Sequence, residues 1–168
     1  MSTTAPLQTE KNKERLPDSE NVIRLLKKTT NEGKISPDEF ELSTLDKVSE
    51  IQSLSVWAER LTSPEQAREF MGAKKEVYML FCSLGVGQIR KLRPAPDNEK
   101  IGPLDVVWDL LTVTHEEIEV PDTRSGAAGH AGITGLLRPP GLPKPDFFSL
   151  RSQLADLAND TLKRISDQ

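Results

Sequence analysis

The chain has 168 residues, of which 36% are hydrophobic and 29% are charged, and its formal net charge is −4. This length fits a single domain with a core of its own, and the charge excludes a highly basic nucleic-acid-binding tail. The lone cysteine, Cys82, excludes an intrachain disulfide, and the longest apolar run, Val77–Cys82, is far shorter than the ~18 residues of a membrane span.

The first 17 residues are polar: they include two leucines and no aromatic residue. Such a stretch buries too little apolar surface to offset its ordering entropy, so we predict a flexible arm over residues 1–17. A single domain over residues 18–168 follows. The polar start carries no visible signal peptide, and together with the single cysteine it predicts a cytoplasmic, reducing location.

Three helices are predicted in the first half of the domain. The first begins at Asp18 or Ser19, ends near Thr30 and is stopped by Gly33. The next two begin at Ser36-Pro37-Asp38-Glu39 and Ser63-Pro64-Glu65-Gln66, where serine caps the helix, proline fixes the first turn and Glu39 or Gln66 closes a capping box. Apolar residues at helical spacing extend these helices over residues 37–61 and 64–84.

The second half of the domain is predicted to hold two more helices. Residues 86–102 form a connector, and a helix begins at Pro103 and fades after Leu111. Residues 115–120 form either a helical turn or a short strand. The last helix is capped by Asp146 and covers about residues 147–165. The predicted fold is therefore all-α, a bundle of about five helices with a long Gly/Pro-rich loop over residues 121–145.

Four glycines, Gly126, Gly129, Gly132 and Gly135, are spaced three residues apart within that loop. Four triplets are too few for a collagen helix, and no Gly-Lys-Ser/Thr follows for a phosphate loop. The loop is interpreted either as a flexible surface segment or as a contact element whose small residues allow close approach of another chain.

Two sets of residues are candidate binding sites. Apolar residues of the loop and of the last helix are candidates for a protein interface: Ile133, Leu136, Leu137, Phe147 and Phe148. Basic residues within and after the predicted helix over residues 64–84 are candidates for a groove that binds RNA phosphates: Lys74, Lys75, Arg90, Lys91 and Arg93.

Residues that carry catalysis are scarce. His115 and His130 are the only histidines, and His115-Glu116 lacks the second histidine of a zinc-hydrolase motif. The sequence therefore predicts no enzyme, no cofactor, no metal site and no small-molecule substrate.

These features favour a non-enzymatic structural protein that self-associates into a homo-oligomer. The first alternative is an RNA-packaging subunit of the coat or nucleocapsid kind, and the second is a protein–protein adaptor that uses its C-terminal amphipathic helix.

Overall fold

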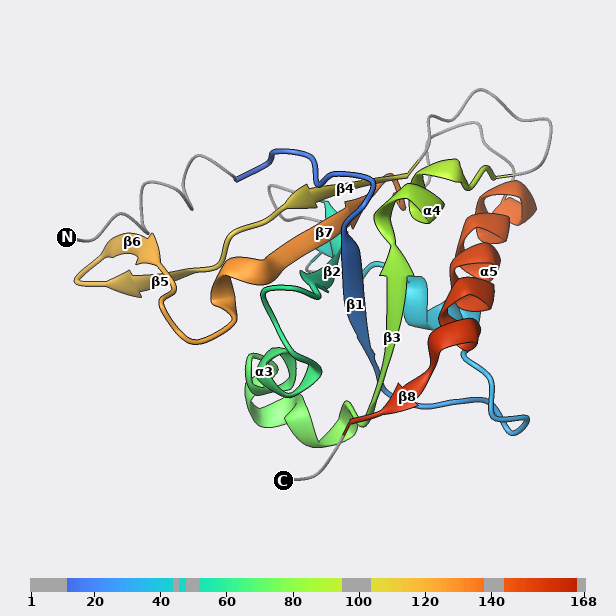
Figure 1. Ribbon diagram of the computed structural model, residues 1–168, viewed down its shortest axis with the longest axis horizontal. Helices are drawn as coiled ribbons and strands as arrows, with labels where there is room; N and C mark the ends of the chain where they lie inside the picture. Colours follow the sequence, from blue (N-terminus) through green and yellow to red (C-terminus); the bar gives the residue numbers. More distant parts are fainter. Residues whose placement is uncertain (1–11, 44–45, 48–51, 95–103, 138–143, 166–168) are drawn as a thin grey trace.

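The computed structural model describes residues 12–43, 46–47, 52–94, 104–137 and 144–165. Within these ranges the protein is mainly β, so the predicted all-α helical bundle is wrong (Figure 1). Six strands form an antiparallel sheet in the order β4-β7-β2-β1-β3-β8, and β5 and β6 form a separate two-stranded hairpin.

The strands are β1 (Asn21–Leu26), β2 (Ser53–Ala58), β3 (Leu80–Gly85), β4 (Asp105–Trp108), β5 (Thr112–His115), β6 (Ile118–Pro121), β7 (His130–Thr134) and β8 (Lys163–Arg164). The α-helices are α3 (Pro64–Glu69), α4 (Val86–Lys91) and α5 (Lys144–Thr161), and the 3-10 helices are η1 (Pro37–Phe40), η2 (Gly72–Val77) and η3 (Ala127–Gly129). None of the helices in the described ranges has the length and hydrophobicity that crossing a bilayer requires.

The central strands are buried on both faces, and this explains why they were mistaken for helices. Residues 22–26 of β1 read Val-Ile-Arg-Leu-Leu, and the side chains of Val22 and Leu26 join one core while those of Ile23 and Leu25 join the other. A strand between two cores lacks the alternation of polar and apolar residues that identifies a half-exposed strand. The same apolar residues fit a helical period equally well.

One core lies between the sheet and α5. It contains Leu150 and Leu154 of α5, Phe40 of η1, and inward-facing residues of the strands such as Val56 and Ile133. The smaller core on the opposite face joins Trp57 of the sheet to Ala67 of α3 and includes Ile23, Leu25 and Ile165. The predicted C-terminal helix is confirmed as α5, although it begins before Asp146 and ends before residue 165.

Both predicted serine caps are present. Ser63 and Gln66 form a complete capping box at the start of α3, as predicted. Ser36 accepts a hydrogen bond from the amide of Asp38 and opens η1, but Glu39 does not close a box there because its carboxylate accepts from the Lys27 amide. The caps locate the helix starts correctly, whereas the helices they begin end after only four to six residues.

The glycines of the predicted loop allow a buried strand to pack closely. Residues 130–134 form β7, which lies between β4 and β2, so this part of the stretch is not a surface loop. Gly126 and Gly135 have φ values of 88° and 94°, in the left-handed region that favours glycine. A Cβ on Gly129 or Gly132 would instead collide with Thr62 or Ser53. Backbone conformation therefore requires glycine at positions 126 and 135, and close packing requires it at positions 129 and 132. Together these two requirements produce the spacing of three residues.

Part of the predicted N-terminal arm packs on the sheet. Residues 13–16 run along the outer side of β4, where the Leu16 amide donates to the carbonyl of Val106 and the Lys13 amide donates to that of Trp108. The Leu16 side chain is fully buried. Residues 13–16 of the predicted arm are therefore packed against the domain, and residues 1–11 lie outside the described ranges.

Candidate functional site

The hairpin of β5 and β6 projects from the body of the protein at the left of Figure 1. Cross-strand pairs join Val113 to Val120 and His115 to Ile118, so these four side chains share one face of the hairpin. Ile118 is 64% exposed and Val113 is 41% exposed. A two-stranded hairpin is marginally stable alone, and on this face Val113, His115 and Ile118 are exposed while Val120 is half-buried.

The tip of the hairpin has an unfavourable backbone. Glu116 and Glu117 form the two-residue turn between paired His115 and Ile118, and their φ values are 51° and 67°. Two consecutive left-handed residues are typical of a type I′ turn, in which Asn-Gly is strongly preferred. Each left-handed glutamate costs about 1 kcal/mol relative to the right-handed region. Such strain often occurs at functional positions.

The base of the hairpin is held firmly. The Asp122 amide donates to the carbonyl of Leu111 over 2.9 Å, and the buried Asp122 carboxylate accepts from the Arg124 guanidinium over 2.7 Å. The hydrogen bonds from Arg124 lower the pKa of Asp122. The Arg124 guanidinium also stacks 4.4 Å from the centre of the Phe70 ring. These contacts fix the direction in which the hairpin projects.

His130 joins the hairpin base to the sheet. Its Nδ1–H donates to the carbonyl of Asp109 over 2.5 Å, because a carbonyl can only accept, and its Nε2 accepts from the Ser55 hydroxyl over 3.2 Å. The ring also lies edge-on to Trp57, with centroids 4.7 Å apart. Through these contacts His130 joins residue 109, which follows β4, to β2.

Burial lowers the pKa of His130 below its ordinary value of 6.5. Near pH 6.5 the histidine therefore binds a proton more readily in the unfolded chain than in the folded one. Protonation favours the unfolded state, so the free energy of unfolding must decrease as the pH falls below about 6.5. We expect His130 to contribute a slope of up to about 1.4 kcal/mol per pH unit to the free energy of unfolding.

Urea denaturation of wild type and His130→Gln at pH 7.5 and 5.5 measures this contribution, with His115→Gln, which removes an exposed histidine, as the matched control. If the free energy of unfolding changed equally with pH in wild type and His130→Gln, groups other than His130 would be responsible for the loss of stability at low pH.

The basic residues proposed for an RNA groove do not converge. Lys74 and Lys75 lie in η2 before β3, whereas Arg90 and Lys91 lie in α4 after it. The six residues of β3 separate the two groups by roughly 20 Å. Lys75 is paired with Glu69 over 3.4 Å.

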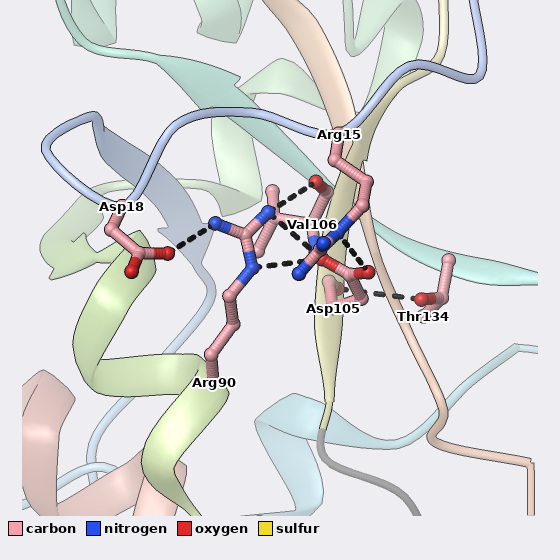
Figure 2. A network of polar contacts seen from close by, with 6 residues as sticks. All are labelled: Arg15, Asp18, Arg90, Asp105, Val106 and Thr134. Atoms are coloured by element: carbon pink, nitrogen blue, oxygen red, sulfur yellow. Dashed lines mark hydrogen bonds and ion pairs between the residues drawn. The ribbon is translucent and has the colours of Figure 1, made fainter.

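Arg90 belongs to a structural network rather than to an open surface (Figure 2). Its side chain is 12% exposed, and its guanidinium bonds Asp18 over 2.5 Å and Asp105 over 2.9 Å. Arg15 contacts the second oxygen of Asp105 over 2.8 Å. The network joins the N-terminal segment to α4 and β4, as Figure 2 shows.

The proposed interface residues divide into buried and exposed ones. Ile133 and Leu136 are 0% and 4% exposed and belong to the main core, so the expectation that they are available at the surface is wrong. Leu137 and Phe148 are exposed, at 40% and 38%. The Phe148 ring has the Arg151 guanidinium 4.9 Å from its centre. The side chain of Phe147 lies outside the described positions.

An open pocket of about 490 Å³ lies where β1 and β2 separate. Their pairing ends at Ile23 and Trp57, and beyond it the Arg24 guanidinium donates to the carbonyls of Ser55 and Glu39 over 2.8 and 2.9 Å. The Arg24 side chain therefore supplies hydrogen bonds at the point where the backbone pairing of β1 and β2 has ended. Burial lowers the pKa of its guanidinium.

The pocket is lined by side chains of both charges, including Lys27, Lys74, Asp38 and Asp46. The described residues contain no group of three or more histidine, cysteine or acidic side chains that could hold a metal ion.

No protein-family model matches the chain, and comparisons with curated proteins and with solved structures find no significant similarity. Sequence reasoning missed the hairpin because Val113, Ile118 and Val120 were divided between a fading helix and an undecided segment. Alternation over residues 112–115 and 118–121 around a two-residue turn is the signal that identifies it.

Proposed function

We propose that the protein is a non-enzymatic structural protein that acts through self-association, and that the hairpin of β5 and β6 is its contact element. The observation that carries this proposal is the uncovered apolar face of the hairpin, on which Ile118 and Val113 are more than 40% exposed. Exposed apolar side chains gathered on one face mark sites that a partner covers. A firmly held base reduces the ordering entropy lost on binding.

The other surfaces give less support to an interface. The β4 edge of the sheet is closed by residues 13–16, and α5 turns its apolar side chains Leu150 and Leu154 into its own core. An adaptor that docks through Leu150 and Leu154 would have to break that packing. RNA packaging would require a basic groove, but the candidate lysines and arginines lie at opposite ends of β3. Arg90 is in addition already bonded to Asp18 and Asp105.

The double variant Val113→Thr/Ile118→Thr tests the proposal. Threonine retains the β-propensity of the strands and removes apolar area, so the hairpin should persist while the association constant falls by at least about tenfold. Light scattering after size-exclusion chromatography over a range of concentrations measures the association, and the 260/280 nm absorbance ratio reports bound nucleic acid.

The matched control is Leu137→Ser/Phe148→Ala, which removes exposed apolar area elsewhere and should leave association unchanged. A wild-type protein that stays monomeric at every concentration would contradict the proposal. If only the control variant lost association, the interface would be formed by Leu137 and Phe148 rather than by the hairpin.

A further inference from the structure

The hairpin combines its apolar face with negative charge. Glu116, Glu117 and Glu119 are all exposed, and the ten residues from Thr112 to Pro121 include no lysine or arginine. Pairing of two hairpins with each other would bring these carboxylates together, and like charges in direct contact are unfavourable. The complementary surface must therefore offer positive charge beside an exposed apolar residue.

The end of the sheet formed by β8 and η2 has this composition. Both residues of β8, Lys163 and Arg164, are exposed, and β8 is the edge strand of the sheet. Lys74 of η2 is exposed as well. Within the described ranges none of these three bases forms an ion pair, whereas the acids Glu69 and Glu76 of this region are already paired with Lys75 and Arg68.

An exposed apolar residue ends η2, three residues after Lys74. Val77, at the end of η2, is 50% exposed and is second only to Ile118 among the exposed large hydrophobic residues. The chain that follows Val77 reaches β8: the Ile165 amide donates to the carbonyl of Met79, and Arg164 is the cross-strand partner of Leu80, three residues after Val77. The two most exposed large apolar side chains of the described chain thus lie in regions of opposite charge.

The acidic hairpin and the basic β8 end cannot meet within one molecule. The hairpin joins β4 to β7 at one edge of the sheet, and β8 forms the other edge (Figure 1). Four to five strand spacings separate the two edges, or roughly 20 Å.

We propose that the hairpin of one copy docks on the β8 end of a second copy, with Ile118 against Val77 and the glutamates of the tip against Lys163 and Arg164. The contact is heterologous, so each copy keeps one free hairpin and one free acceptor, and the assembly grows into a ring or a filament. This inference rests on the proposed self-association and adds the acceptor surface and the symmetry.

Two complementary variants test the acceptor. The hairpin variant Glu116→Asn/Glu117→Gly removes both tip charges and supplies the residues that a type I′ turn prefers, so the hairpin is retained. The acceptor variant Lys163→Gln/Arg164→Gln removes two charges and keeps the length of the side chains. Each variant alone should associate on the order of tenfold more weakly than the wild type, and added salt should weaken its association less than that of the wild type because the attracting charges have been removed.

Mixing the two variants should restore association, but only as a dimer of one copy of each, because the mixture holds one intact hairpin and one intact acceptor per pair. Light scattering measures the mass of this complex. The control Lys91→Gln/Arg93→Gln removes two exposed bases at the α4 end and should associate like the wild type.

The outcomes separate the inference from the proposed function. Wild type that never associates would overturn both. An acceptor variant that associates as strongly as the wild type, or a mixture that forms no dimer, would overturn the acceptor assignment and leave self-association through the hairpin in place.

Discussion

Replacing Gly132 with alanine should lower the free energy of unfolding by about 2–3 kcal/mol, the upper part of the range for overpacking a core. Gly132 is the central residue of β7 and pairs with Ser55 of β2 and Val107 of β4. A Cβ there would lie 2.5 Å from the Cβ of Ser53, and it would collide with the Ser53 hydroxyl as well. The Ser53 Cβ cannot move away by rotation of its side chain, so the strands must shift.

Urea denaturation of Gly132→Ala measures this cost, and a second substitution identifies its cause. Ser53→Gly removes the opposing Cβ, so it should recover part of the stability when combined with Gly132→Ala. Gly85→Ala is the matched control because its new Cβ meets only the flexible side chain of Gln88, and it should cost much less. Equal losses for Gly85→Ala and Gly132→Ala would refute the role of close packing.

Replacing Arg24 with methionine should destabilise the protein by about 3 kcal/mol, because hydrogen bonds to charged groups contribute about 1.5–3 kcal/mol each and two are lost. The Arg24 guanidinium joins the carbonyls of Ser55 and Glu39 where the β1–β2 ladder stops. Methionine fills a similar volume but leaves both carbonyls without this donor. Arg24→Lys should recover only part of the loss, since a single ammonium does not reproduce the planar fork of a guanidinium.

Chemical denaturation of Arg24→Met and Arg24→Lys tests this expectation. The control is Lys27→Met, which removes an exposed base from the same pocket and should change the stability by less than about 0.5 kcal/mol. If Arg24→Met were as stable as Lys27→Met, the guanidinium would not be the group that holds η1 to β2.

The local signals that the sequence supplied were correct where only neighbouring residues were involved. The Ser63–Gln66 capping box and the proline that follows Ser63 act within four residues, and they place the start of α3 correctly. The last helix was recognised because Leu150, Leu154 and Leu157 repeat at helical spacing over many turns. Gly33 was likewise recognised as a stop, and its φ of 77° fits a left-handed turn position.

The candidate site could be predicted only in part. The sequence favoured self-association and left residues 115–120 undecided between a helical turn and a short strand. It did not show that Glu116 and Glu117 form the tip of a hairpin, or that Lys163 and Arg164 form the far edge of the sheet. The sequence also did not show that Arg90 bonds Asp18 and Asp105, because these partners lie 72 and 15 residues away along the chain.

The sequence by itself therefore determined the helix caps and the C-terminal helix, because each depends on residues that are neighbours in the chain. The tertiary structure alone decided the sheet and the exposure of the hairpin. Strand pairing joins residues as distant as Ser53 and Thr134, and a strand buried on both faces has no alternation of polarity to distinguish it from a helix. Which apolar side chains remain uncovered depends on that pairing, because the sheet buries Ile133 and leaves Ile118 exposed.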